Sequence, residues 1–323
     1  MEMLTIHRWQ LVGIGAMLHF LVDGLCLCCL YLMASSLFAS HLVGIFLTYN
    51  ILAFLTQPLT GLWTDRMERR HWMLLASVLL LTMAVLATSI VISLGLAEMG
   101  MLSVAILLGV GNSLFHVWGG NQVAVTTGND MRALGTFVST GAFGLALGIV
   151  FFSWPLLYVA LLAICLLSTA YVHLDLKPSM AEVVNEAAEH RFSRLFVWLS
   201  LLALMLVVML RSHIGETFTG GLSRTSGLVL LTGFLSMSGK MAGGWLARQV
   251  GIVRMLVLVV LIVAVCLVFK GQGMATLLVG LFAVNCTMPV TLYLANVVLP
   301  RREGLAFGLL AAALVPGYLL ATI

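Results

Sequence analysis

The stretch that decides the fold is a charged turn between two apolar segments. It reads Gly61-Leu62-Trp63-Thr64-Asp65-Arg66-Met67-Glu68-Arg69-Arg70. It is echoed 182 residues later by Gly243-Gly244-Trp245-Leu246-Ala247-Arg248. Glycine, tryptophan and arginine recur at the same offsets, whereas Ala247 stands where Asp65 stands in the first copy. Such a repeat in an apolar chain is typical of transporters built from two similar halves, with the substrate site between them near the bilayer midplane.

The composition excludes a soluble domain, because 62% of the 323 residues are hydrophobic, 9% are charged and the mean hydropathy is +1.13. The apolar runs lack the alternation of apolar and polar residues that marks the strands of a membrane β-barrel. They therefore predict an all-α polytopic membrane protein. We expect eleven spanning helices, at 9–33, 41–63, 72–94, 99–122, 133–152, 154–173, 194–216, 226–247, 252–270, 272–298 and 303–323.

A polar insertion divides the predicted helices into two bundles. Residues 1–173 carry six helices, residues 174–193 form a linker, and residues 194–323 carry five helices. Within the linker, Ser179 and Glu182 have the spacing of a capping box, which predicts a short surface helix. Two equal halves would need a twelfth helix, which is absent from this chain or truncated.

The distribution of positive charge predicts the orientation. Twelve of the sixteen lysines and arginines fall on one side of the predicted spans, so that side is expected to be cytoplasmic and to carry the N-terminus. The net charge of +4 reflects this topology, and it indicates no nucleic-acid partner.

Six ionisable side chains fall deep within predicted helices, where burial in lipid is costly unless the side chain faces a cavity or a partner. These are His19 and Asp23 in the first span, His116 in the fourth, Arg211 and His213 in the seventh and Lys240 in the eighth. Spans one, four, seven and ten are therefore expected around a central cavity.

His19 and Asp23 are candidates for proton coupling. At about 1.5 Å per residue they lie about 12 and 18 Å along their helix, near the middle of the bilayer, and four residues apart on one face. A histidine in contact with a carboxylate can hold a transported proton. The alternative is a structural hydrogen bond between helices. His116 is a further proton-coupling candidate, with a packing role as its alternative.

Lys240 and Arg211 place two cations in the second half, opposite the acid of the first. An anionic or zwitterionic substrate would neutralise them. Alternatively, Asp23 or Glu216 already pairs with them, or Arg211 extends towards the surface.

Neutral polar residues complete the candidate substrate site. Asn112, Asn50 and Tyr49 can each hydrogen-bond a substrate, and each can instead hold helices together. Neither a Walker loop nor a zinc-type spacing is found, so we expect no enzyme, no cofactor and no metal. The expected partners are a small-molecule substrate, protons and the lipid bilayer, with the protein as a monomer.

The charged turn resembles the signature loop of the major facilitator superfamily. Within it, the closest resemblance is to the fosmidomycin-resistance-like branch of bacterial drug exporters. The matching motifs are His19-Phe20-Leu21-Val22-Asp23, Leu47-Thr48, Gln57-Pro58, Trp63-Thr64-Asp65 and Leu114-Phe115-His116. The chain departs from the branch at Glu68 and at Val117-Trp118-Gly119-Gly120.

This resemblance implies a secondary transporter that works by alternating access in the bacterial inner membrane. Its expected activity is proton-coupled export of a small amphipathic drug or metabolite; the alternative is an organic-anion importer or exchanger that uses Lys240 and Arg211. The loop acid is expected to brace one conformation by pairing with nearby arginines. The expected gating residues are Gly61, Asp65, Arg66, Arg69, Arg70, Arg132 and Arg248.

Overall fold

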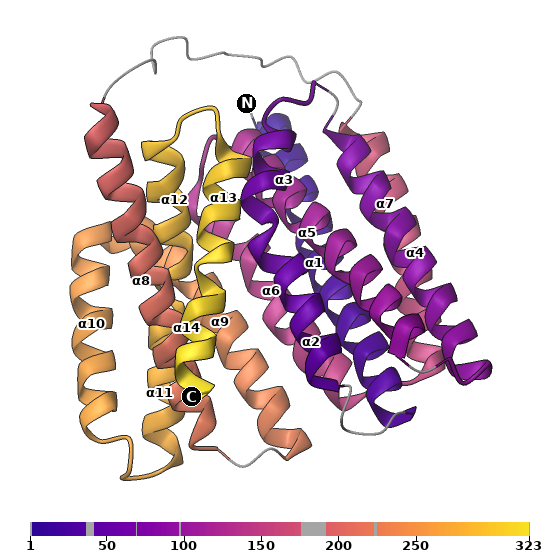
Figure 1. Ribbon diagram of the computed structural model, residues 1–323. Coiled ribbons are helices and arrows are strands. Elements are labelled where there is room, and N and C mark those ends of the chain that lie inside the picture. The colour runs from indigo at the N-terminus through magenta and orange to yellow at the C-terminus, as the bar shows by residue number, and fades with distance from the viewer. Residues whose placement is uncertain are drawn as a thin grey trace.

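The computed structural model describes residues 2–36, 42–68, 70–96, 98–175, 192–222 and 225–322 (Figure 1). All regular structure in these ranges is helical. The first half contains α1 Glu2–Ser36, α2 Leu42–Asn50, the π-helical η2 Ile51–Leu55, α3 Gln57–Thr64, α4 His71–Ser93, α5 Glu98–Thr127, α6 Met131–Val150 and α7 Trp154–Asp175. The second half contains α8 Arg194–Gly220, α9 Ser226–Val250, α10 Ile252–Val268, α11 Met274–Asn285, α12 Met288–Val298, α13 Glu303–Ala312 and α14 Leu314–Thr322.

These elements form eleven spans within the described ranges, as the sequence predicts. The elements α2, η2 and α3 make one span, as do α11 with α12 and α13 with α14. Nine spans are long and apolar enough to cross a membrane, and the shorter α10 is also apolar. The predicted all-α polytopic fold is confirmed.

Three spans are interrupted where the sequence analysis predicts continuous helices. A π-helical segment at 51–55 precedes Pro58, a turn at Cys286 and Thr287 precedes Pro289, and a turn at Ala313 precedes Pro316. Proline lacks an N–H and its ring clashes with the preceding turn, so each break lies just before one.

The helices pack as two groups that meet along two seams (Figure 1). In the first group α1 packs on α5, α6 and α7, and in the second α9 and α8 pack on α11. The seams are α6 against α9 and α3 against α13. The bundle boundary at 174–193 stays a prediction, because the linker and its predicted helix lie mostly outside the described residues.

Glycines allow the closest helix contacts. A side chain at Gly144 would overlap the Phe20 carbonyl of α1, and one at Gly308 would overlap the Gln57 carbonyl at the start of α3. Small residues let helix backbones approach in this way. The contacts fix α1 against α6, and therefore fix the height at which the ionisable residues of α1 lie.

The helices differ greatly in burial. Helices α1 and α5 and the α11–α12 span are mostly buried, in agreement with central positions. Helix α8 is mostly exposed, and its buried residues are Leu201, Val208, Arg211 and Phe218.

Candidate functional site

Three of the predicted residues form one buried cluster, here called the triad. His19 and Asp23 come from α1 and His116 from α5. The Nε2 atoms of the two histidines lie 2.8 Å apart. The Asp23 carboxylate lies 3.3 Å from Nε2 of His19 and 3.4 Å from Nε2 of His116.

The close contacts of the two histidines are all hydrogen bonds at once only if the triad holds one extra proton. Nδ1 of His19 lies 2.7 Å from the Phe137 carbonyl oxygen, and Nδ1 of His116 lies 2.9 Å from that of Asn112. A carbonyl oxygen only accepts, so both Nδ1 atoms carry hydrogen. If both rings were neutral, two Nε2 lone pairs would face each other at 2.8 Å. The contact is a hydrogen bond only when one histidine is an imidazolium, and Asp23 is its counter-charge.

Asn112 supports the carboxylate. Its side-chain N–H₂ donates to Asp23 Oδ1 at 3.0 Å and also lies 3.7 Å from the Cys26 sulfur. The Tyr49 phenol in turn interacts with Cys26, and both side chains are buried. Asn112 and Tyr49 were predicted as substrate ligands. In the structure Asn112 contacts Asp23 directly, and Tyr49 is linked to it through Cys26.

A missing side chain makes room for the triad. A Cβ at Gly141 of α6 would overlap both Asp23 Oδ2 and His19 Nε2. Gly141 was not among the predicted site residues. A glycine facing two ionisable residues is visible only once α1 and α6 are packed together.

The triad also has the residue types of a metal site, since its three ligand atoms lie within 4.8 Å of one another. Two imidazole nitrogens bound to a tetrahedral zinc ion at about 2.0–2.1 Å would lie about 3.3 Å apart. The observed Nε2–Nε2 distance of 2.8 Å is shorter and fits a shared proton better. The absence of a metal therefore stays the expectation.

Two cations lie across the interface from the triad. Lys240 lies on α9 of the second half, and α9 packs on α6 of the first. Arg211 on α8 is only 7% exposed, and its Nε and Nη2 atoms have no hydrogen-bond partner among the described residues. No ion pair of either cation is found in the described part of the chain. The arrangement leaves positive charge that a bound anion can neutralise.

Asn50 lies apart from these groups. Its side-chain N–H₂ donates to the Phe46 carbonyl one turn earlier in α2, at 2.7 Å. This hydrogen bond is local to the helix, so the structure shows no link between Asn50 and the triad.

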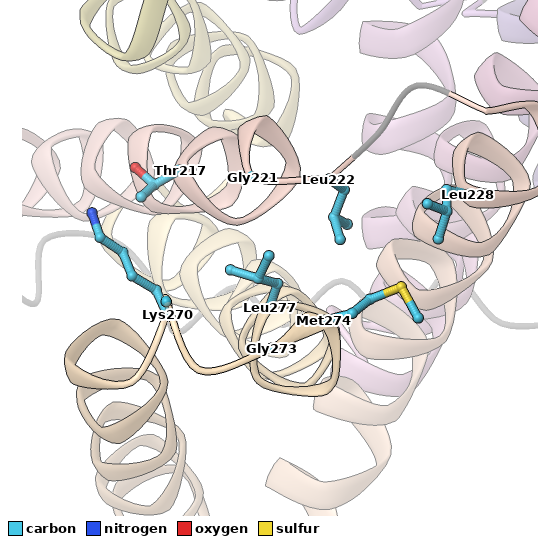
Figure 2. Close-up of a pocket in the computed structure, with 9 residues that line it drawn as sticks. Thr217, Gly221, Leu222, Leu228, Lys270, Gly273, Met274 and Leu277 are labelled. Atoms are coloured by element: carbon cyan, nitrogen blue, oxygen red, sulfur yellow. The ribbon is translucent and has the colours of Figure 1, made fainter.

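A surface hollow lies away from all predicted site residues. It has a volume of about 600 Å³ and is formed by the end of α8, the start of α9 and the α10–α11 turn (Figure 2). Its lining is mostly apolar, with Leu222, Leu228 and Leu277, and includes the polar side chains of Thr217 and Lys270. The buried charges do not line it.

The predicted gate lies at the end of the bundle where α7 ends and α8 begins, here called the linker end. Asp65 accepts hydrogen bonds from the backbone N–H groups of Gly304 and Leu305, at 2.8 and 2.9 Å, and from Asn121 at 3.0 Å. Burial raises the pKa of the Asp65 carboxyl, and the two backbone donors act against this rise. Asp65 thus caps the start of α13, where the helix dipole favours an anion.

The gating arginines do not pair with Asp65 in the described residues. Arg132, one expected partner, binds Asp130 instead, with its Nη2 atom 2.6 Å from Oδ2. Burial raises the pKa of Asp130, but these hydrogen bonds outweigh it and hold the value below its usual range. Arg66 is exposed, Arg70 acts on Asp65 only over a longer range, and Arg69 lies outside the described residues.

Arg132 also joins the two halves. Its guanidinium lies 5.7 Å from the centre of the Trp9 ring and 5.3 Å from that of Trp245, which are distances of cation–π contacts. Arg248 acts on Asp130 from the same helix as Trp245. Gly61 packs against Gly304 at the other seam. Each copy of the duplicated motif therefore contacts the opposite half.

We expect Asp65→Asn to weaken the contact between the halves at the linker end. Asn keeps the shape but loses the charge that binds the N–H groups of Gly304 and Leu305, and charge-assisted hydrogen bonds contribute about 1.5–3 kcal/mol. The equilibrium should shift about tenfold or more towards a separated linker end. Pulsed electron paramagnetic resonance would measure the distance between spin labels placed at Trp72 and Val297, which are both exposed.

Glu68→Gln is the matched control, because Glu68 is an exposed acid in the same turn. An unchanged distance distribution in Asp65→Asn, or an equal shift in Glu68→Gln, would refute the brace.

Comparison with known proteins identifies the fold. The sequence matches the Major Facilitator Superfamily over residues 12–322. The structure is similar to the transporter FucP in its outward conformation (TM-score 0.74, 12% identity, 96% of this chain and 90% of that chain). It is also similar to the human organic anion transporter MFSD10 (TM-score 0.62, 17% identity, 97% of this chain and 92% of that chain).

A further similar structure is a bacterial homologue of the iron transporter ferroportin, in an outward-facing state with soaked iron (TM-score 0.58, 18% identity, 98% of this chain and 89% of that chain). No curated protein matches the sequence. At these identities the structures support the fold, and the sequence match supports the family. The chain belongs to the Major Facilitator Superfamily, and it is a multi-pass integral membrane protein.

Proposed function

We propose that this superfamily member is a proton-coupled secondary transporter, with the triad as its proton site. The 2.8 Å contact between the His19 and His116 Nε2 atoms carries this proposal, because it is a hydrogen bond only when a proton is present. The cluster is buried and centred on α1 and α5, so the proton is held away from bulk water. It can be exchanged only when the protein opens to one side or the other.

The bound substrate is an organic anion in this proposal, held by Lys240 with help from Arg211. These cations lie in the second half and the triad lies in the first, so a substrate between them contacts both halves. A site at this interface is what alternating access needs, because the halves move around it. The support for an anion is the lack of a described counter-ion for either residue.

A second candidate is export of a neutral or amphipathic drug or metabolite. The motifs shared with fosmidomycin-resistance-like exporters favour it, above all His19 with Asp23 and Leu114-Phe115-His116. Under this candidate Lys240 is a structural partner of Asp23. For both candidates we propose a monomer in a bacterial inner membrane, with the linker end in the cytoplasm.

Lys240→Gln separates the two candidates. Removing the ammonium should weaken binding of an anion about tenfold or more, the scale of one charge-assisted contact of about 1.5–3 kcal/mol. A neutral compound of the same shape should bind as before. The measurement is calorimetric binding of benzoate and of its neutral isostere benzamide to the purified protein.

Lys270→Gln is the matched control, because it makes the same change in the surface hollow of Figure 2. It should leave benzoate binding intact. Equal losses for benzoate and benzamide in Lys240→Gln would return Lys240 to a structural role. A loss confined to Lys270→Gln would move the anion site to the hollow.

A further inference from the structure

Arg211 is a buried cation with one unused hydrogen-bonding edge. Its side chain lies on α8, the residue is only 7% exposed, and Nε and Nη2 have no hydrogen-bond partner in the described part of the chain. Burial removes the hydration of these donors, and an unpartnered buried charge is strongly unfavourable. A ligand that brings acceptor atoms and negative charge to this edge would remove that cost.

The two unpartnered atoms form the edge of the guanidinium that binds a carboxylate. Their N–H groups point in parallel, and their spacing matches the two oxygens of a carboxylate. The same two atoms of Arg132 bind a carboxylate elsewhere in this protein. Nε of Arg132 lies 3.1 Å from Asp130 Oδ1, and Nη2 lies 2.6 Å from Oδ2. Arg211 presents the same edge without an acid.

The helices around Arg211 supply no acid to it. Helices α11, α12 and α14 pack on α8 and contain neither Asp nor Glu. Helix α13 also packs on α8, but its acid is Glu303, the first residue of α13, at the linker end. Glu216 lies five residues after Arg211 on α8, and at 3.6 residues per turn it faces a different direction. None of these helices therefore provides the counter-charge, whereas a bound anion can.

Arg211 lies at the level of an interrupted span. The hydroxyl of its neighbour Ser212 donates to the carbonyl of Leu314 at 3.0 Å, and Leu314 begins α14 directly after the turn at Ala313. Discontinuous helices typically form the substrate sites of transporters. Lys240 lies at a similar height. Measured from the end of the bundle where α8 ends and α9 begins, Arg211 is about 14 Å and Lys240 about 21 Å along its helix.

We infer that the substrate is a carboxylate and that Arg211 determines this specificity by donating its Nε–H and Nη2–H to the two carboxylate oxygens. This inference rests on the proposed function and names the class of its anion. Lys240 contributes positive charge, whereas Arg211 selects for two acceptor atoms side by side. A phosphonate is disfavoured, because this edge cannot reach its third oxygen, which would need another buried donor.

Arg211→Lys tests the inference, because lysine keeps the charge and loses the paired donors. Three anions are titrated calorimetrically into the purified protein at neutral pH: benzoate, phenylphosphonate and pentafluorophenolate, which has a single oxygen. Wild-type protein should bind benzoate about tenfold or more tightly than the other two, the scale of one charge-assisted contact. Arg211→Lys should weaken benzoate binding by a similar factor and leave pentafluorophenolate binding nearly unchanged.

Arg211→Met gives a second measurement that needs no ligand. Replacing an unpaired buried charge by an apolar side chain of similar length is expected to be neutral or stabilising. Ligand-free Arg211→Met should therefore unfold at a temperature no lower than that of the wild type, and benzoate should no longer raise this temperature.

Arg254→Lys is the matched control, because Arg254 is an exposed arginine near the start of α10. It should leave the binding of all three anions intact.

The outcomes distinguish this inference from the proposed function. Equal losses of benzoate and pentafluorophenolate in Arg211→Lys, or phenylphosphonate bound as tightly as benzoate by the wild type, would overturn the carboxylate specificity. Benzoate binding that is lost in Lys240→Gln but unchanged in Arg211→Lys would place Arg211 outside a valid anion site. A lower unfolding temperature of ligand-free Arg211→Met would give Arg211 a structural role. If none of the three anions binds the wild type, the proposed anion site is wrong, and this inference falls with it.

Discussion

Asp23→Asn is expected to abolish transport driven by a pH gradient. Asn keeps the volume and the hydrogen bond to Asn112, but the imidazolium of the triad loses its counter-charge. Removing one partner of a buried ion pair costs about 3–5 kcal/mol, so the proton should be absent from the triad at neutral pH. Lys240 and Arg211 remain, so exchange of labelled for unlabelled anion should continue. The measurement is uptake into proteoliposomes with and without a pH gradient.

The control for this variant is Asp175→Asn, which makes the same change at the end of α7, away from the triad. Both activities should persist in Asp175→Asn. If Asp23→Asn still accumulated substrate against a gradient at the wild-type level, Asp23 would have no part in proton coupling. A metal-dependent triad gives a different signature, because prolonged treatment of the wild-type protein with a chelator would then abolish transport.

The helices were predictable because lipid allows few alternatives. Long apolar runs must form helices in a membrane, so eleven spans follow from hydropathy. Their breaks were missed, although Pro58, Pro289 and Pro316 mark them. Those prolines carry a local steric signal that hydropathy averages away. The π-helical segment beside Tyr49 needs the packed neighbours as well, and no periodicity in the sequence predicts it.

Part of the triad was predictable from one helix. His19 and Asp23 are four residues apart, so they share a face in any α-helix. His116 joins the group only through the packing of α1 on α5, which the sequence does not reveal. The Phe137 carbonyl, which lies next to Nδ1 of His19, comes from a third helix. Asn112 was predicted to bind substrate. Its hydrogen bond to Asp23 could not be foreseen from the fourth span alone.

The gate shows a second limit of sequence reasoning. Asp65 was identified from its motif, and arginines were the expected partners because side-chain charges are visible in a sequence. Its observed partners include the backbone N–H groups of Gly304 and Leu305. Every residue but proline carries such a group. No sequence pattern singles these two out, and only the packing of α3 against α13 reveals them.

Gly141→Ala is expected to disable the triad with one added methyl group. The new Cβ would overlap Asp23 Oδ2 and His19 Nε2, so those atoms must move apart. Overpacking of this kind costs about 1–3 kcal/mol, while alanine favours the helix over glycine by about 1 kcal/mol. The fold should therefore survive, with a thermal midpoint near that of the wild type. The contact between the His19 and His116 Nε2 atoms should be lost. Proton-driven transport should therefore fall at least about tenfold.

Gly13→Ala is the matched control for the added methyl group. Gly13 lies in α1, the helix of His19 and Asp23, and a Cβ there meets no atom within 4 Å. Transport should be unchanged in this variant. If Gly141→Ala kept wild-type proton-driven transport, the spacing of the triad would not matter. The hypothesis that His19 and His116 share a transported proton would then be contradicted. Loss of transport in Gly141→Ala with benzoate exchange retained would separate damage to the proton site from damage to the anion site, because Lys240 and Arg211 approach from the other half.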